Sequence, residues 1–168
     1  MDIMGATAIP FGGIEIQEQW EIVRKDRLDK NRDLQQFIAR VRRMEPLKAL
    51  TAVNDYVNNN LTYRADTDNA WVTANTTIRG GSGDCEDFAI LKMQILHDVG
   101  FAEQSLGIVV VKDSQRAAHH AVLVVNVENT WHILDIVDRQ VLPSTYTTNY
   151  QPLFGFFGEQ GFLFGKRQ

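Results

Sequence analysis

The chain changes from a glycine-rich turn to an apolar helix at residues 80–96, GGSGDCEDFAILKMQIL. The glycines allow the backbone to turn tightly and to come close to a ligand. The apolar residues that follow have helical spacing, and Gly100 is typical of the residue that ends a helix. This stretch therefore predicts a buried helix whose first turn carries Cys85, the single cysteine of the chain.

Helical patterns also dominate the residues before this stretch. Apolar residues recur at helical spacing in residues 15–43, where Asn31 either breaks the pattern or caps a second helix. Pro46 suits the first turn of a further helix, and the asparagines at 58–60 are expected to end it. Residues 62–83 are polar and are expected to form a loop.

The second half of the chain has the pattern of strands. Three segments rich in β-branched residues, 106–111, 120–127 and 130–137, are bounded by turn signals. Because the helices come first and the strands second, we expect an α+β fold with an antiparallel sheet. Residues 1–168 are the length of one domain. Residues 1–14 are expected to form a flexible or extended arm of it.

The C-terminus is rich in phenylalanine and glycine. One interpretation is a final strand or hairpin that packs on the sheet. The other is an exposed apolar patch that binds a partner or a second copy of the chain. The phenylalanines are Phe154, Phe156, Phe157, Phe162 and Phe164.

Composition excludes several classes of protein. With 44% hydrophobic and 23% charged residues, the chain is neither disordered nor a coiled coil. A formal net charge of -4 without a basic run argues against nucleic acid as a partner. The apolar runs are too short for a transmembrane segment, and a single cysteine excludes a disulfide framework and cysteine-rich zinc sites. Residues 1–14 lack the basic start and apolar core of a signal peptide, so a cytoplasmic location stays open.

Cys85 has two interpretations, a buried apolar residue or a reactive thiol. Its place in the first turn of a helix favours the second. Unpaired N–H groups and the helix dipole stabilise an anion there, so they lower the pKa of a thiol. The same N–H groups can bind an oxyanion.

A reactive cysteine needs a base, and His119 and His120 at the start of a strand are the candidates. Strand alternation places them on opposite faces, so only one can face the helix of Cys85. Asp135 interrupts an apolar run on the next strand, where a histidine on the neighbouring strand would pair with it. The other interpretation of Asp135 is a solvent-facing residue at a strand end. Asp138 competes with it, although its surroundings are typical of a turn.

Three segments in this order resemble the bacterial transglutaminase-like cysteine proteinases: residues 83–92, 120–123 and 133–135. The resemblance extends over about residues 50–152. This family includes a periplasmic protease that releases adhesins from the cell surface. The resemblance implies a papain/transglutaminase-like fold, in which the N-terminal helices and the nucleophile helix pack on an antiparallel sheet. It also implies a cysteine endopeptidase, a hydrolase without an organic cofactor.

The resemblance assigns Cys85 as the nucleophile, His120 as the base and Asp135 as the residue that orients the base. His120 is preferred to His119 because the family has a histidine directly followed by a small or apolar residue. Attack on a peptide carbonyl of a protein substrate would give a thioester, which water then hydrolyses. Two alternatives stay open. One is acyl transfer to an amine, as in true transglutaminases, and the other is a non-catalytic calcium-binding regulatory module on the same fold.

Carboxylates surround the cysteine. Asp84 suits the N-cap of the helix, with Asp87 completing a capping box. Negative charges beside a thiolate raise its pKa, and a bound divalent cation would cancel that effect. Oxygen-only ligands favour Ca²⁺. The resemblance implies calcium at Asp84 and Glu86, since the adhesin-processing members depend on calcium through acidic residues at these positions.

Residues 66–69, DTDN, start like an EF-hand loop but depart from it at the sixth and twelfth positions, so a capped turn is the preferred interpretation. The resemblance also suggests an extracytoplasmic location and a periplasmic or cell-surface protein as the substrate. The oligomeric state is not predicted.

Overall fold

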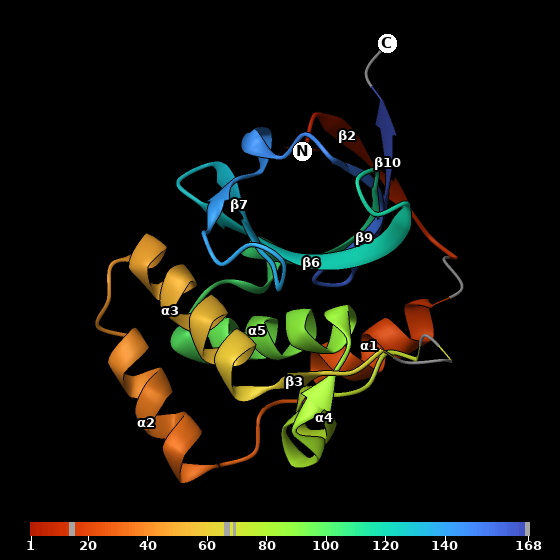
Figure 1. Cartoon of the computed structure of the whole chain (residues 1–168). Coiled ribbons are helices and arrows are strands. Elements are labelled where there is room, and N and C mark those ends of the chain that lie inside the picture. The colour runs from red at the N-terminus through yellow and green to blue at the C-terminus, as the bar shows by residue number, and fades with distance from the viewer. Residues whose placement is uncertain (14–15, 66–67, 69, 167–168) are drawn as a thin grey trace.

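Helices and strands form separate layers of the molecule (Figure 1). The computed structural model describes residues 1–13, 16–65, 68 and 70–166. Within these residues the α-helices are α1 (Gln17–Lys25), α2 (Arg32–Val41), α3 (Pro46–Asn60), α4 (Ala74–Gly80) and α5 (Cys85–Val99).

The helix ends follow local capping signals. Asn31 caps α2, because its side-chain oxygen accepts the Leu34 N–H at 3.1 Å. Pro46 is the first residue of α3, as expected. The expected end of α3 is confirmed, because the asparagines at 58–60 form its last turn and the chain becomes extended at Leu61.

Residues 62–83 are not the plain loop that the sequence predicted. They contain α4, which is capped by the Thr73 side chain and ends at Gly81 with a φ of 70°. The strands β3 (Thr62–Tyr63) and β4 (Ser82–Gly83) pair in parallel and join the two ends of this segment. The prediction is wrong because α4 is only 7 residues long and largely polar, so no apolar stripe reveals it.

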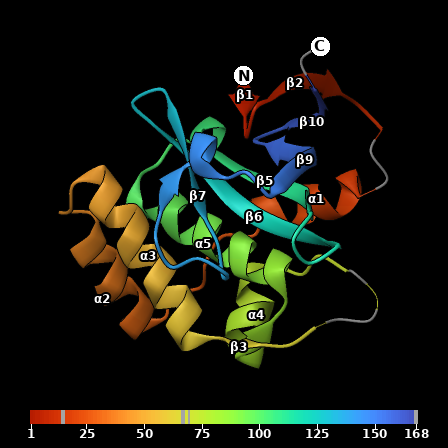
Figure 2. The same ribbon diagram turned by 45° about the horizontal axis from the view of Figure 1, so that its top comes forward.

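The expected antiparallel sheet is confirmed. Within the described residues, an 8-stranded sheet has the order β1-β2-β10-β9-β5-β6-β7-β8, and each pairing is antiparallel. The sheet curls so that its two ends approach each other, and the Met4 N–H lies 3.5 Å from Ser144 Oγ (Figures 1 and 2). The strands are β1 (Asp2–Ile3), β2 (Ala6–Phe11), β5 (Leu106–Asp113), β6 (Ala118–Val127), β7 (Thr130–Leu134), β8 (Leu142–Pro143), β9 (Tyr150–Phe157) and β10 (Gln160–Lys166).

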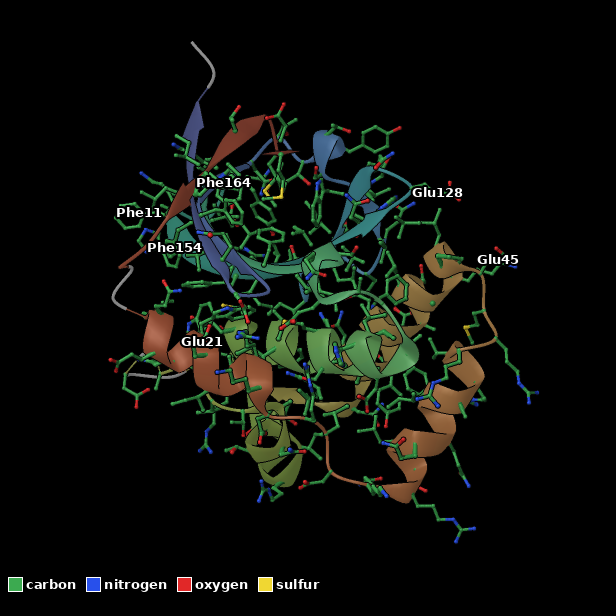
Figure 3. All side chains as sticks on the ribbon, turned by 180° about the vertical axis from the view of Figure 1, so that it is seen from behind. Phe11, Glu21, Glu45, Glu128, Phe154 and Phe164 are labelled. Atoms are coloured by element: carbon green, nitrogen blue, oxygen red, sulfur yellow. The ribbon has the colours of Figure 1, made fainter. Side chains whose placement is uncertain are left out.

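Segments from both halves of the chain meet in this sheet. Of the segment expected as a flexible or extended arm, residues 2–3 and 6–11 form β1 and β2, and β2 pairs with β10. Strands β9 and β10 form a hairpin, which confirms the first interpretation of the phenylalanine-rich segment. Phe154 and Phe164 lie on its two strands, at the same end of the molecule as Phe11 (Figure 3).

Helix α5 is the centre of the main hydrophobic core. It lies between the sheet and the other helices (Figure 1), and Ile90, Ile95 and Leu96 on it are fully buried. The concave face of the sheet encloses a smaller core that includes Val109 and Val122. Among the described residues, no helix combines the length and apolar character needed to cross a membrane. The burial of α5 makes its first residue, Cys85, part of a rigid element.

Candidate active site

Cys85 is the first residue of α5, as the sequence predicts. The expected capping box is confirmed: Asp84 accepts the Asp87 N–H at 3.4 Å, and Asp87 accepts the Asp84 N–H at 3.1 Å. A Cβ atom on Gly83 would lie 2.6 Å from the Asp87 Cβ, so this position requires glycine. The turn and the capping box together fix the backbone that carries the thiol.

His120 and Asp135 form a buried hydrogen-bonded pair. His120 lies on β6, and its Nε2 is 2.7 Å from Asp135 Oδ1. The two side chains are 9% and 5% exposed. Asp135 lies directly after β7, which ends at Leu134 and not at residue 137 as predicted. A pair of this kind is able to orient an imidazole.

The two competing candidates lie elsewhere. His119 is exposed and stands opposite Lys112 across the strands. Asp138 is also exposed, and its carboxylate accepts the Gln140 N–H at 2.9 Å within a turn. The structure thus brings His120 to Asp135 and leaves His119 and Asp138 on the surface.

The thiol of Cys85 lies against β6, the strand that carries His120. Its sulfur lies close enough to the N–H of Ala121, the residue that follows His120, for this amide to act to lower the pKa of the thiol. Because Nε2 of His120 binds Asp135, Nδ1 is the ring nitrogen left for a second partner. The cysteine, the histidine and the carboxylate therefore come from α5, β6 and the end of β7.

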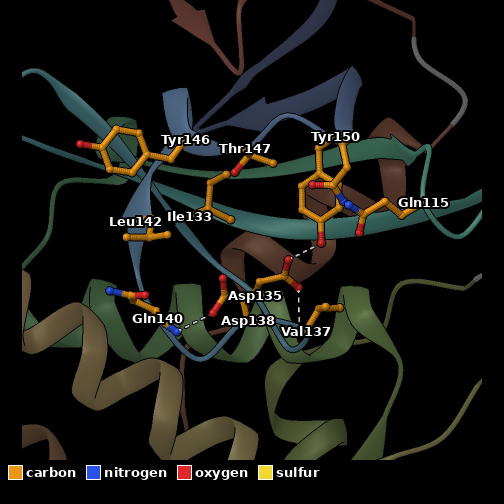
Figure 4. Close-up of a pocket in the computed structure, with 11 residues that line it drawn as sticks. Gln115, Ile133, Asp135, Val137, Asp138, Gln140, Leu142, Tyr146, Thr147 and Tyr150 are labelled. Atoms are coloured by element: carbon orange, nitrogen blue, oxygen red, sulfur yellow. Dashed lines mark hydrogen bonds between the residues drawn. The ribbon is translucent and has the colours of Figure 1, made fainter.

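Asp135 is held as a charged carboxylate. Burial acts to raise its pKa, but hydrogen bonds outweigh burial and lower the pKa overall. Oδ1 accepts His120 Nε2 and the Val137 N–H at 3.1 Å, and Oδ2 accepts the Tyr150 hydroxyl at 2.5 Å (Figure 4). A charged Asp135 keeps a proton on Nε2 of His120, so Nδ1 is free to accept one.

The surroundings of Cys85 disfavour its thiolate. Burial and then the charge of Glu86 raise the pKa of Cys85 to about 12, and the Ala121 hydrogen bond only partly opposes them. The thiol donates to Glu86 Oε2 at 3.4 Å. The sequence predicted that the helix N-terminus lowers the pKa of Cys85 and that the neighbouring carboxylates raise it. In the structure, burial and the acidic neighbours outweigh the effect of the helix N-terminus.

Glu86 and Asp84 place two carboxyl groups in contact. Burial and this contact raise the pKa of Glu86 to about 8. Like charges so close need a proton or a cation between them, and carboxylate oxygens are ligands that Ca²⁺ prefers. The pair fits such an ion as part of a shell of about six to eight oxygens, with backbone carbonyls or water as the others.

Within the described part of the chain, no wider cluster of metal ligands accompanies this pair. Among the described residues, no three His, Cys, Asp or Glu side chains gather as a metal site. Residues 66, 67 and 69 of the second acidic stretch lie outside the described part of the chain. Asp84 and Glu86 were expected from the sequence as calcium ligands. In the structure their carboxyl groups are in contact.

Three further side chains support the site, and none of them was predicted as a site residue from the sequence. Tyr150 binds Asp135 Oδ2, while Asn58 and Asn54 on α3 donate to the carbonyls of Asp135 at 2.9 Å and Arg139 at 3.3 Å. Asn54 is fully buried within an apolar stripe, and a polar residue in such a stripe was a visible signal. Tyr150 gave no signal, because its contact with Asp135 depends on how distant strands pair.

Two cavities flank the pair of His120 and Asp135. One, of about 480 Å³, opens beside His120 and has both apolar and polar walls, with Arg116 among the lining residues. The other, of about 220 Å³, lies on the side of Asp135 and Tyr150 (Figure 4). The first is lined by Asn58, Leu61, Tyr63, Phe88, Arg116, His120, Ile136 and Val137.

Known proteins share this fold and sequence pattern. The profile of the family described as bacterial transglutaminase-like cysteine proteinase matches residues 16–154. Calcium-bound LapG from Legionella pneumophila is 24% identical over 89% of this chain and 88% of its own, with a TM-score of 0.72. Another structure of Legionella pneumophila LapG is 25% identical over 92% of this chain and 90% of its own, with a TM-score of 0.70.

An EGTA-treated form of Legionella pneumophila LapG is also similar, with 25% identity, coverage of 92% of this chain and 87% of its own, and a TM-score of 0.70. A comparison with curated proteins gives no match. The family match spans most of the chain and confirms both the resemblance and the papain/transglutaminase-like fold that it implied. The chain belongs to the bacterial transglutaminase-like cysteine proteinase family and is a cysteine peptidase of the transglutaminase-like type.

Proposed function

We propose that Cys85, His120 and Asp135 form a catalytic triad that hydrolyses peptide bonds in a protein substrate. The observation that carries this proposal is the 2.7 Å hydrogen bond between His120 Nε2 and Asp135 Oδ1. It joins two buried side chains of the types that activate a nucleophile. The contact of the Cys85 sulfur with the amide that follows His120 supports Cys85 as that nucleophile.

The reaction begins when His120 Nδ1 takes the proton from Cys85 Sγ and the sulfur attacks the carbonyl carbon of the peptide bond. The charge of Asp135 stabilises the imidazolium that results. The Cys85 N–H, at the first position of α5, has no carbonyl partner within the helix, so it can donate to the oxyanion, whereas the Asp87 N–H is taken by Asp84. The leaving amine takes the proton from His120, and water then hydrolyses the thioester on Cys85 with His120 again as the base.

The cavity beside His120 supports a segment of protein chain as the substrate. Its apolar wall, which includes Phe88 and Ile136, suits the side chains of a bound peptide. Arg116, which also lines the cavity, adds a guanidinium that can donate to peptide carbonyls or to a carboxylate. Substrate residues on this side of the scissile bond would therefore lie next to His120.

Calcium dependence forms a second part of the proposal, with Asp84 and Glu86 as ligands. The contact between their carboxyl groups supports it, because a cation would neutralise both charges. A bound Ca²⁺ supplies positive charge that lowers the pKa of a neighbouring thiol. The calcium-bound and EGTA-treated structures of Legionella pneumophila LapG add support from a similar protein.

An extracytoplasmic location and a periplasmic or cell-surface substrate complete the proposal. The family resemblance supports both, since the family includes a periplasmic protease that releases adhesins. Transfer of the acyl group to an amine would use the same three residues, and a non-catalytic calcium-binding module would use none of them. Product analysis separates these three functions.

Peptide-library profiling tests the proposed reaction. The protein with Ca²⁺ is incubated with a proteome-derived peptide library and a labelled primary amine, and mass spectrometry identifies new peptide ends and amine adducts. New ends that are absent in the Cys85→Ala variant are the expected result. Amine adducts without new peptide ends would contradict hydrolysis and support transfer. The absence of both products would contradict both reactions.

Calorimetric titration tests the calcium part. Ca²⁺ should bind the wild type, and Glu86→Gln should weaken binding by at least about tenfold, since it removes one of two charged ligands. Asp138→Asn, which removes an exposed carboxylate outside the site, is the matched control and should bind like the wild type. Equal binding by the wild type and Glu86→Gln would show that Ca²⁺ does not use this pair.

A further inference from the structure

The hydroxyl of Tyr150 reaches the oxygen of Asp135 that His120 does not use. It donates to Oδ2 at 2.5 Å, whereas Oδ1 accepts His120 Nε2 and the Val137 N–H (Figure 4). The ring centroids of Tyr150 and His120 lie 5.6 Å apart. Oδ1 of Asp135 therefore has two donors and Oδ2 has one, and the two side-chain donors, His120 and Tyr150, come from different strands.

The sheet holds the Tyr150 side chain in this place. Tyr150 is the first residue of β9 and stands opposite Asp113 of β5. Its ring is buried in the smaller core together with Val111 and Ile133. The neighbouring Asn149 side chain donates to Asp113 at 3.1 Å, which fixes the start of β9 against β5. The strand thus places the hydroxyl, and little freedom is left for it to turn away from Asp135.

We propose that Tyr150 is a positioning residue of the peptidase, whose hydroxyl fixes the rotamer of Asp135 so that Oδ1 stays directed at His120. This inference rests on the proposed role of Asp135 in orienting His120. The torsion at the end of an aspartate side chain is broad and roughly two-fold, so the donors on Oδ1 alone leave Oδ2 able to turn. A donor on each oxygen, held by separate strands, restrains it firmly.

The hydroxyl also affects the charge of Asp135. A hydrogen bond from a hydroxyl stabilises an ionised carboxylate. Without it, a buried oxygen of Asp135 would lose its partner, and the carboxyl group would hold a proton up to a higher pH. A protonated Asp135 no longer stabilises the imidazolium of His120, so the active state would form only at higher pH.

The direct test is the titration of the Asp135 carboxyl carbon by NMR in the whole protein. In Tyr150→Phe, which removes only the hydroxyl, the midpoint should rise by roughly half to one pH unit. Tyr146→Phe is the matched control, because Tyr146 lines the same cavity but is 69% exposed. It should leave the midpoint unchanged. An unchanged midpoint in Tyr150→Phe would overturn the inference.

The second readout separates positioning from a purely structural role. The rate of Cys85 alkylation by iodoacetamide is measured against pH in the presence of Ca²⁺. In Tyr150→Phe the acid limb should move to higher pH, while in the Asp135→Asn background Tyr150→Phe should have no further effect. A shifted Asp135 titration with an unmoved acid limb would contradict positioning and leave Tyr150 a structural residue.

A wrong proposed function would give a different result. In that case the rate of Cys85 alkylation would be the same in the wild type and in His120→Ala. Even then, the titration midpoint of Asp135 in Tyr150→Phe, compared with the wild type, decides whether the Tyr150 hydroxyl positions Asp135. If Tyr150→Phe does not fold, the phenol of Tyr150 is titrated instead in the wild type and in Asp135→Asn. Its midpoint should fall in Asp135→Asn, and equal midpoints would overturn the inference.

Discussion

Asp135 and Lys92 are both buried ionisable residues, and their surroundings act on their charges in opposite directions. Asp135 accepts hydrogen bonds on both oxygens, which outweigh burial and lower its pKa. Lys92 on α5 is 1% exposed, and its Nζ lies 5.9 Å from the Phe88 ring centroid. Burial lowers the pKa of Lys92 to about 7, and the charge of Asp135 only partly opposes it. A charged carboxylate at Asp135 and a Lys92 amine that is about half charged near pH 7 follow from these surroundings.

Lys92 should make the stability of the wild type depend on pH in the alkaline range. The pKa of lysine in an unfolded chain is about 10.4, and the folded value is about 7, so the unfolded state binds more protons between them. The free energy of unfolding should therefore rise from about pH 7 to about pH 10, by up to about 1.4 kcal/mol per pH unit. The stability gained at high pH is lost again as the pH falls to the pKa of Lys92 in the folded state, about 7.

Urea titrations across this pH range measure the effect. Lys92→Met should remove the rise, whereas Lys48→Met, at an exposed position on α3, should keep it. A wild type whose stability does not change with pH over this range would contradict a lowered pKa for Lys92.

At the scale of elements, the start of α5 could be predicted well and the segment before it could not. The glycine turn, the capping box of Asp84 and Asp87, and the end at Gly100 are local signals, and the structure has all of them. Helix α4 and the pairing of β3 with β4 were missed, because they depend on contacts between the two ends of the segment. The end of β7 was placed too late, since Ile136 and Val137 continue the apolar pattern beyond the last ladder residue, Leu134.

Gly83→Ala should damage the element that carries the nucleophile. A Cβ at this position would meet the Asp87 Cβ at 2.6 Å and its Oδ2 at 2.8 Å, so the capping box must shift. We expect a loss of about 1–3 kcal/mol in the free energy of unfolding and slower alkylation of Cys85. Gly80→Ala is the control, because nothing lies within 4 Å of its Cβ. Equal stability of the two variants would show that Gly83 is not tightly packed.

At the scale of the whole molecule, the order of helices and strands along the chain predicted the fold class. The order of the strands within the sheet could not be predicted from the sequence. Strand β9 inserts between β5 and β10, and β2 pairs with the far end of the chain. No local pattern encodes such pairings. The contact of Tyr150 with Asp135 was missed for the same reason, whereas Cys85, His120 and Asp135 stand out because their types and order match a family.

Deleting residues 1–11 should destabilise the whole sheet. The deletion removes β1 and β2, takes the buried Ile3 out of the smaller core, and leaves β10 as an unpaired edge. Exposed edges pair with other chains, so we expect a lower Tm together with dimers or larger aggregates. Thermal unfolding and size-exclusion chromatography measure both effects. A monomer with an unchanged Tm would show that this segment contributes nothing to the sheet.

The central claim, that Cys85 is a nucleophile activated by His120, is tested most directly by the pH profile of Cys85 alkylation. Iodoacetamide labelling, mapped by mass spectrometry, is compared among the wild type, His120→Ala and the control His119→Ala, with Ca²⁺ and with a chelator. With Ca²⁺, the wild type and His119→Ala should react well below about pH 8, faster than a free thiol of ordinary pKa, and His120→Ala should not. With chelator the rate should fall, because burial and Glu86 then hold the pKa of Cys85 at about 12. Labelling of the calcium-loaded wild type no faster than that of a free thiol, or unchanged in His120→Ala, would contradict the claim.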